Sequence, residues 1–276
     1  MPQLAIVLPT YNEAENLGPL VRELESLDLD FQLLIVDDNS QDGTRELAQE
    51  LSAVYKNITV IERPSKLGLG SALRAGLAAA LATDARYLLT MDADRSHDPQ
   101  DVPRLMDELT VGSGTALIPN YKPSSTDNCI KGMADASPDL VQASRYISGG
   151  GITGMPSFRR ISSRLANLIY RWCARGPKEF TNNFRVFSRR AAGVAVERSK
   201  GQHYEFVPEA MLLILAAGMK VAEVPTIFNG RVSGRSKMGP MQAIRGVACL
   251  FSASIQYRFA IGRFSRRPYI DDPPSS

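Results

Sequence analysis

The chain has 276 residues, 44% of them hydrophobic and 22% charged, which is enough apolar material for the buried core of one large domain. This composition excludes a disordered chain, and two histidines are too few for a multi-histidine metal centre, so carboxylates would hold any metal. The three cysteines, Cys129, Cys173 and Cys249, lack metal-ligand spacing, and with no signal-peptide pattern beside them they predict packing residues in a reducing cytoplasm.

Short apolar runs and helical patterns alternate along the first half of the chain. Continuous, mostly apolar runs that end in polar residues predict parallel strands at 4–10, 32–38, 57–62, 87–91 and 139–143. Helical patterns lie between them at about 13–27, 43–55, 70–83 and 99–109. The alternation predicts an α/β fold with a doubly wound, mostly parallel sheet.

Polar residues follow three of these strands, at Pro9 to Glu13, Asp37 to Ser40 and Asp92 to Asp94. Because ligands of such sheets bind beyond the carboxyl ends of the strands, these residues are expected to share one rim. Tyr11 is suited to stacking on a base, and Glu13 suits either the edge of that base or the N-terminus of the first helix. Asp38 is suited to hydrogen bonding with a base or a ribose.

The glycine pattern argues against a dinucleotide-dependent dehydrogenase. The fingerprint Gly-x-Gly-x-x-Gly would follow the first strand, where Pro9 to Glu13 stand instead. The glycine cluster at 67–72 follows the third strand and indicates the start of a helix.

Asp92 and Asp94, separated by one residue, lie at the end of a buried strand. Two carboxylates in this position form a hard-oxygen site suited to Mg²⁺ or Mn²⁺ carrying a diphosphate. A solvated turn or a helix N-cap at Asp98 explains the same residues without a metal. The neighbouring strand ends favour the metal.

The residues from 158 to 178 and from 231 to 267 contain many arginines and lysines but no Asp or Glu, although the net charge is only +3. Such segments predict contact with phosphates, a lipid headgroup layer or nucleic acid. Nucleic acid is disfavoured, because aromatic residues do not alternate with the basic ones and no binding motif is present.

Residues 158–175 form an amphipathic helix when placed on a helical wheel. An apolar arc carries Phe158, Ile161, Leu165, Leu168, Ile169 and Trp172, and arginines flank it. This pattern suits an interfacial helix in a membrane surface, or a core-facing helix with a solvated basic edge. Residues 241–264 show a similar stripe, whose uncharged part is too short to span a bilayer.

Seven sequence motifs together resemble the inverting nucleotide-sugar glycosyltransferases of the GT-A fold, and within them the dolichyl-phosphate mannosyltransferases. The motifs extend over nearly the whole chain, at Val7–Glu13, Val36–Thr44, Lys66–Gly70, Met91–Asp94 with Ser96 and His97, Ser144–Gly151, Asn183–Arg185 and Val224–Lys237. The first four are typical of the broad family. The block from Ser144 to Gly151 and that from Arg231 to Lys237 point to lipid-phosphate acceptors.

The resemblance implies a role for individual residues. The nucleotide-sugar donor would contact Pro9, Tyr11, Glu13, Val36, Asp38, Asp92, Ala93, Arg231 and Lys237. The divalent ion, Mg²⁺ or Mn²⁺, would be held by Asp92, Asp94 and the oxygen of Ser96. The acceptor phosphate and its lipid would contact Arg145, Arg159 and Ser163. Asp94, Arg145 and Arg231 would be the catalytic residues, acting by positioning and charge stabilisation.

Four features depart from the family pattern. Arg95 stands where an apolar residue is usual and either reaches a phosphate or points away, and Arg235 replaces a common Glu. Glu179 to Asn183 replace the usual acid-x-Thr-Ser-Gly, and 110–138 lengthens a connection that is usually short. We expect this insertion to be mobile, as a substrate lid or as a surface excursion.

The resemblance predicts a single GT-A domain over 1–265, with C-terminal amphipathic basic helices. Its parts would be a donor-binding part at about 1–109, an insertion at about 110–138 and an acceptor- and membrane-facing part at about 139–265, before a flexible tail at 266–276. The enzyme would lie at the cytoplasmic membrane surface as a peripheral protein, and would bind anionic lipid.

The sequence is compatible with three functions. The first is inverting transfer of a hexose, mannose from GDP-mannose, onto a polyprenyl phosphate of the dolichyl type. The second uses another nucleotide sugar, such as UDP-glucose, or a soluble saccharide acceptor, for which Glu205 or Glu209 would serve as the base. The third is a non-catalytic nucleotide-sugar sensor or membrane-surface adaptor, which the presence of both metal carboxylates disfavours.

Overall fold

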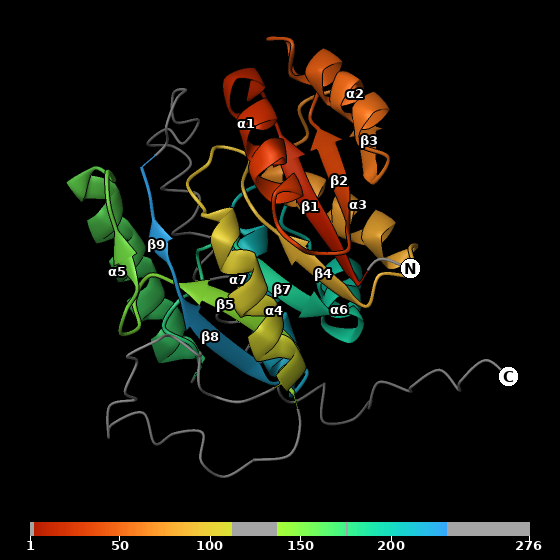
Figure 1. The fold of residues 1–276 in the computed structure, drawn as a ribbon. Helices are drawn as coiled ribbons and strands as arrows, with labels where there is room; N and C mark the ends of the chain where they lie inside the picture. The colour runs from red at the N-terminus through yellow and green to blue at the C-terminus, as the bar shows by residue number, and fades with distance from the viewer. Residues whose placement is uncertain (1–2, 112–136, 175, 231–276) are drawn as a thin grey trace, which may run out of the picture.

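A seven-stranded sheet lies at the centre of the computed structural model, which describes residues 3–111, 137–174 and 176–230 (Figure 1). The strand order is β3-β2-β1-β4-β7-β5-β8. The strands span β1 Leu4–Thr10, β2 Phe31–Asp37, β3 Ile58–Glu62, β4 Tyr87–Thr90, β5 Leu140–Ser144, β7 Arg185–Ser188 and β8 Val221–Pro225. A two-stranded ladder, β6 Gly151–Ile152 with β9 Ile227–Phe228, lies apart from this sheet.

Helices cover both faces of the sheet. They span α1 Ala14–Glu25, α2 Thr44–Val54, α3 Leu69–Leu81, the 3₁₀ turn η1 Pro99–Asp101, α4 Val102–Val111, α5 Ser157–Cys173, α6 Arg189–Arg198 and α7 Phe206–Ala216. The expected doubly wound α/β fold is confirmed. The five predicted strands and the four predicted helices all form within one or two residues of their expected bounds. The one exception is the helix expected from residue 99, whose first three residues form the 3₁₀ turn η1 before α4 begins. Three predicted features lie outside the described residues: the amphipathic segment at 241–264, the insertion beyond residue 111 and the tail at 266–276.

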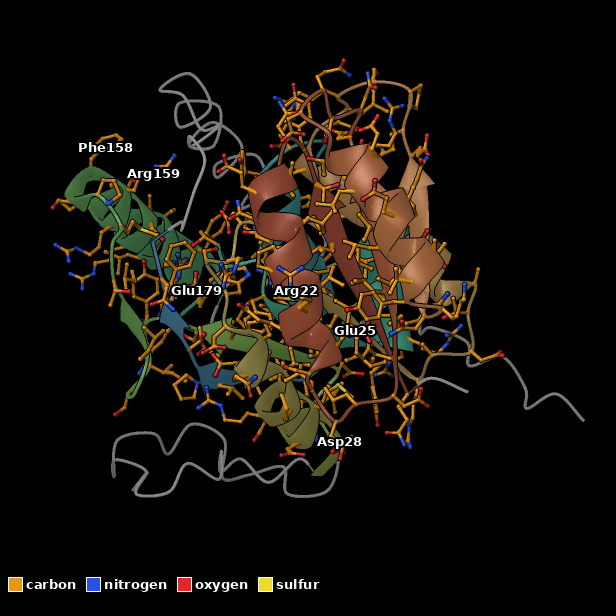
Figure 2. All side chains as sticks on the ribbon, turned by 45° about the horizontal axis from the view of Figure 1, so that its top comes forward. Arg22, Glu25, Asp28, Phe158, Arg159 and Glu179 are labelled. Carbon is orange, nitrogen blue, oxygen red and sulfur yellow. The ribbon has the colours of Figure 1, made fainter. Side chains whose placement is uncertain are left out.

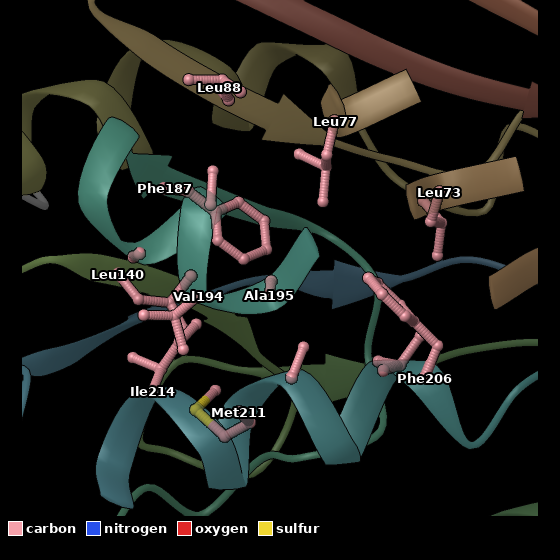
Figure 3. Packing of buried hydrophobic residues seen from close by; sticks show 14 of the residues in the cluster. Leu73, Leu77, Leu88, Leu140, Phe187, Val194, Ala195, Phe206, Met211 and Ile214 are labelled. Atoms are coloured by element: carbon pink, nitrogen blue, oxygen red, sulfur yellow. The ribbon is translucent and has the colours of Figure 1, made fainter. Parts of the chain in front are cut away.

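Two separate cores follow from the alternation of side chains along each buried strand. Ala5 and Val7 of β1 face a cluster formed with α3, α6 and α7, which Figure 3 shows from close by. Leu4, Ile6 and Leu8 face the opposite cluster, formed with α1, α2 and α4. Because both faces are covered, β1 is buried along its whole length, which explains its continuous apolar sequence.

The reversed direction of β7 decides what lies at the rim of the sheet. β7 pairs antiparallel with both β4 and β5, and Arg185 at its start is opposite Thr90 at the end of β4. The amino end of β7 therefore meets the carboxyl ends of its neighbours, β4 and β5. The loop that leads into β7 is thereby brought beside Asp92 and beside the segment that follows β5.

The helix α5 lies at the β8 end of the sheet, apart from α1 and α2 (Figure 1). It packs on the protein through Ala166, Asn167, Ile169 and Tyr170, of which Asn167 and Tyr170 are buried. The five apolar residues of the opposite face, Phe158, Ile161, Leu165, Leu168 and Trp172, are 56% to 80% exposed. Of the predicted apolar arc only Ile169 packs against the core. A core-facing stripe is therefore wrong for this helix.

No helix in the described part of the chain combines the length and the apolar character needed to cross a membrane.

Candidate active site

The two carboxylates of the predicted metal site follow β4 on the rim of the sheet. Asp94 is buried and its Oδ1 accepts from the backbone N–H of Ser96 at 3.1 Å. The hydroxyl of Ser96 is fully buried and has no hydrogen-bond partner among the described residues. A buried oxygen without a partner is costly unless something else contacts it.

This donor set fits a hard divalent cation. Within the described ranges no three His, Cys, Asp or Glu side chains converge on one point. Mg²⁺ is usually bound by one or two carboxylates together with substrate phosphates and water, rather than by a full protein cage. Asp92, Asp94 and the unpartnered Ser96 oxygen are thus the residues that would hold the ion, and donor phosphates would complete its shell.

Asp92 is fixed by two contacts, one from the distant residue Asn183 and one from His97 in the same segment. Its side-chain Oδ1 accepts from Asn183 Nδ2 at 3.1 Å, and its backbone N–H donates to His97 Nδ1 at 3.1 Å. The His97 ring is buried and stacks on Phe184, with 5.0 Å between the ring centroids. Since Nδ1 accepts from an N–H, the proton of the neutral ring is on Nε2, which donates to Asn182 Oδ1 at 2.8 Å.

The residues expected to hold the nucleoside lie along the same rim. Pro9 and Val36 are neighbours in the paired strands β1 and β2, and Ala93 is buried beside the metal carboxylates. Tyr11 is partly exposed, and Lys66 Nζ lies over its ring at 3.9 Å from the centroid. Lys66 and Tyr11 therefore bring a positive charge and an aromatic face to one place.

Glu13 and Asp38 are tied into the protein more closely than their sequence positions indicate. Glu13 is buried and accepts from Asn16 Nδ2 at 2.8 Å. Asp38 accepts from the backbone N–H groups of Leu67 and Gly68, at 3.1 and 2.8 Å, and its Oδ1 is 2.9 Å from Arg63 Nη1. Asp38 thus shapes the loop after β3, whatever else it contacts.

Arg95, between Asp94 and Ser96, does not face the rim. Its backbone is left-handed, with φ of 58°, and its guanidinium pairs with Glu23 of α1. Of the two alternatives left open by the sequence, the side chain takes the one that points away from the phosphates.

Arg145 follows β5 and forms a two-point ion pair with Glu179. Arg145 Nε and Nη2 donate to the two Glu179 oxygens at 2.8 and 2.9 Å. Glu179 is fully buried and Arg145 is 8% exposed. In the sequence, Glu179 stands out only as part of a departure from the family pattern. The acid-x-Thr spacing was the available signal, because Thr181 also contacts both members of the pair, at 2.9 Å from Arg145 Nη2 and 2.8 Å from Glu179 Oε1.

Burial and charge act in opposite directions on this pair. Burial lowers the pKa of Arg145, but the Glu179 charge and hydrogen bonds outweigh it and leave the pKa raised. Burial likewise raises the pKa of Glu179, whereas the Arg145 charge and the Thr181 hydrogen bonds bring it below its ordinary value. Both groups are therefore charged at neutral pH.

Of the residues expected at the acceptor, Arg145 and Ser163 lie in contact on the inner side of α5. Ser163 Oγ accepts from Tyr146 Oη at 2.8 Å and lies 3.4 Å from Arg145 Nη2. Arg159 is one turn before Ser163 on α5, so the two side chains share a helix face. Figure 2 shows Arg159 at the outer end of α5 and Glu179 closer to the sheet. Arg231 and Lys237 lie outside the described residues.

The two carboxylates considered as general bases are committed to the backbone. Glu209 accepts from the N–H groups of Lys200 and Gly201, the latter at 2.7 Å. Glu205 Oε1 accepts from the N–H groups of Gln202 and His203 at 3.0 and 3.1 Å. Carboxylates that hold a loop in this way are poorly suited to accept a proton from a neutral hydroxyl.

Known proteins resemble the chain over most of its length. Polyprenol monophosphomannose synthase of Mycolicibacterium smegmatis is 33% identical over 238 residues, which are 84% of this chain and 80% of that protein. Dolichol-phosphate mannosyltransferase of Pyrococcus furiosus is 30% identical over 241 residues, or 86% of this chain, and the match spans 59% of that longer protein.

Solved structures agree with the fold. Glucosyl-3-phosphoglycerate synthase from Mycobacterium tuberculosis, crystallised with Mg²⁺ and uridine diphosphate, superposes with a TM-score of 0.62 at 17% identity. The superposition covers 92% of this chain and 79% of the other, and identifies the architecture as GT-A-like. The model of the family described as Glycosyl transferase family 2 matches residues 5–193. With the strand-end motifs gathered on one rim of a GT-A-like sheet, the chain belongs to glycosyl transferase family 2 and is a glycosyltransferase.

Proposed function

We propose that the enzyme transfers mannose from GDP-mannose to a polyprenyl phosphate, with inversion at the sugar carbon and with Mg²⁺ or Mn²⁺ as the cofactor. The observation that carries the proposal is the buried Arg145 and Glu179 pair beside Ser163, on the same rim as Asp92 and Asp94. A guanidinium whose direction is fixed by a buried carboxylate, next to a site suited to a metal and a diphosphate, can serve a second, anionic substrate. The names of the two curated relatives, a polyprenol monophosphomannose synthase and a dolichol-phosphate mannosyltransferase, supply the sugar and the acceptor class.

The acceptor determines what the residues must do. A phosphate monoester has a second pKa of about 6, so its oxygen is already anionic at neutral pH and needs no strong base. Arg145 and Arg159 would hold this phosphate, and Glu179 would keep the Arg145 guanidinium facing it. A divalent ion held by Asp92 and Asp94 would supply charge neutralisation to the departing nucleoside diphosphate. Tyr11 and Lys66 would bind the nucleoside.

The exposed stripe of α5 supports a peripheral place at the cytoplasmic membrane surface. Five large apolar side chains face away from the protein, and the arginines of the helix border them. A helix of this kind lies in the headgroup layer with its apolar face toward the acyl chains. Anionic lipids would bind the basic border, and the acceptor phosphate would enter from the membrane next to Ser163.

Replacing Leu165 and Leu168 together with Gln is expected to weaken binding to vesicles that contain anionic lipid by at least about tenfold, because each leucine loses its burial in the membrane. Flotation of the purified protein with such vesicles measures the effect. Val54→Gln is the matched control, since Val54 is 70% exposed on α2. Equal binding by all three proteins would rule out α5 as the membrane contact.

Glu209→Gln is expected to leave turnover nearly unchanged and to lower the free energy of unfolding by about 1 to 3 kcal/mol, because it weakens the hydrogen bonds that hold residues 200–201. Initial rates and thermal unfolding of the same preparation separate the two effects. A loss of turnover without a loss of stability would favour a general base, and with it a saccharide acceptor.

One transfer assay tests the proposal as a whole. The enzyme with Mg²⁺ or Mn²⁺ is offered labelled GDP-mannose, UDP-glucose and other nucleotide sugars together with a polyprenyl phosphate, and label is sought in the organic phase. Label is expected from GDP-mannose. Transfer from no donor, in a protein that binds nucleoside diphosphate, would refute the lipid-phosphate acceptor, and preferred transfer from another donor would refute mannose.

A further inference from the structure

The segment from Glu179 to Asn183, here the 179–183 loop, joins the two halves of the candidate site. Glu179 and Thr181 contact Arg145 on the acceptor side. Asn182 and Asn183 contact the segment after β4, at His97 and Asp92. The first half of the loop serves the expected acceptor site, and the second half serves the expected metal site.

Asn183 is placed firmly enough to orient a partner. It is 6% exposed, and its carbonyl oxygen accepts from Thr90 Oγ1 at 2.6 Å, which ties the residue to the last residue of β4. Its Nδ2 then donates to Asp92 Oδ1 at 3.1 Å. Asn183 is thus hydrogen-bonded twice to this part of the chain, to Thr90 at the end of β4 and to Asp92, which is 91 residues away in the sequence.

The backbone of Asp92 is held by a second path that ends on the same loop. Its N–H donates to His97 Nδ1, and His97 Nε2 donates to Asn182 Oδ1. Asn182 Nδ2 in turn donates to the carbonyl oxygen of Ala143 at 2.9 Å, next to the end of β5. The position of Asp92 therefore depends on Asn182 through its backbone and on Asn183 through its carboxylate.

Arg185 keeps the loop itself in place. It is almost fully buried and donates to the carbonyl oxygens of Phe180, Asn182 and Val207. Burial lowers the pKa of Arg185 to about 9, with the charge of Glu179 acting in the opposite direction, so the group is charged at neutral pH. A cation inside the loop fixes the carbonyls on either side of Thr181, and the amide side chains have little freedom to move.

From these contacts we propose that Asn183 is a positioning residue for the metal site, which holds the Asp92 carboxylate in the orientation that the divalent ion requires. The inference rests on the metal site of the proposed function. A ligand carboxylate that keeps a hydrogen bond to a neighbouring amide has its rotation fixed, and loss of such a partner lowers metal affinity about 10- to 100-fold.

The test measures metal binding directly rather than transfer. Mn²⁺ binding to the full chain is followed by electron paramagnetic resonance, with GDP or UDP present and no sugar or lipid. Asn183→Ala is expected to weaken Mn²⁺ binding about tenfold or more. In the transfer assay, the metal concentration that gives half-maximal activity is expected to be higher for Asn183→Ala than for the unchanged protein. The KM for the lipid phosphate at saturating metal is expected to stay unchanged.

Two further variants make the result specific. Asn183→Ser keeps a polar side chain, but its hydroxyl is one bond too short to reach Asp92, so the contact is lost. This variant is expected to weaken Mn²⁺ binding to the same extent, and it replaces Asn183→Ala if that variant folds poorly. Asn57→Ala is the matched control, because Asn57 Nδ2 also donates to a carboxylate, Glu25 Oε1 at 3.0 Å, away from the rim. Its Mn²⁺ affinity is expected to equal that of the unchanged protein.

The outcomes separate the two proposals. Mn²⁺ binding within twofold of the unchanged protein, in folded Asn183 variants, would overturn the positioning role. An unchanged protein that binds no Mn²⁺ in the presence of nucleoside diphosphate would overturn it too. Weakened Mn²⁺ binding, in a protein that transfers no sugar to lipid phosphate, would uphold the positioning role and refute the proposed function.

Discussion

Asp94→Asn is expected to lower kcat by about a thousandfold, because the variant loses a carboxylate that would hold the divalent ion, whose positive charge would stabilise the departing diphosphate. Asp94 is buried and its Oδ1 already accepts from the Ser96 N–H, so an amide of the same shape fits the space but binds a divalent cation poorly. Initial rates with the identified donor, measured over a range of Mn²⁺ concentrations, show whether added metal restores any activity.

A control variant distinguishes this effect from general damage to the fold. Asp139→Asn removes a carboxylate that pairs with Arg190, at the amino end of β5 and so at the opposite edge of the sheet. It is expected to fold and to turn over normally. Full activity of Asp94→Asn beside a normal control would show that the metal assignment is wrong.

Glu179→Gln is expected to destabilise the protein by about 3 to 5 kcal/mol, because it leaves the buried Arg145 cation without its counter-charge. The same change is expected to raise the KM for the lipid phosphate, since the guanidinium loses the partner that fixes its direction. Denaturant unfolding gives the change in the free energy of unfolding, and transfer rates over a range of acceptor concentrations give the change in KM.

Replacing both members of the pair separates the two effects. Glu179→Leu with Arg145→Met exchanges a buried ion pair for apolar groups, which typically costs much less stability than removing one partner. The double variant is therefore expected to unfold at higher denaturant concentration than Glu179→Gln, and still to bind the acceptor poorly. Normal acceptor binding in the double variant would exclude Arg145 from the acceptor site.

The same pair predicts a pH dependence of stability. The pKa of Glu179 is below its ordinary value of 4.5 in the folded protein, so its contribution is fully present above that value. It is lost as the pH falls from about 4.5 through the folded pKa. In acid-unfolding experiments the unchanged protein is expected to lose more stability below pH 4.5 than Glu179→Gln does, and parallel curves would contradict the assignment.

Local pattern was sufficient for the strands that build the donor side. The runs that become β1, β2 and β4 are buried on both faces, so their apolar sequence marks them without reference to any other part of the chain. Polar residues at their ends mark the rim for the same reason, because the direction of these strands follows from the alternation with helices. Asp92 and Asp94 were placed correctly on that rim by sequence reasoning.

The contacts that hold the site together come from pairings that no local pattern reveals. β7 is reversed, and a short buried strand has the same apolar residues in either direction. That reversal helps to bring Asn183 to Asp92 and Glu179 to Arg145, across 91 and 34 residues. The outward face of α5 was undecided for a related reason, since a helical wheel gives the apolar arc but not the side from which the protein approaches.

The sequence by itself thus determined the fold class, the rim and the chemical types of the residues on it, because burial and backbone period act over a few neighbouring residues. Only the tertiary structure decided which side chains hold one another: Arg145 with Glu179, Asp92 with Asn183, and Arg95 with Glu23 instead of a phosphate. These choices depend on strand direction and on packing between distant segments. Such interactions contribute free energy only after the chain has folded, so they leave no periodic trace in the sequence.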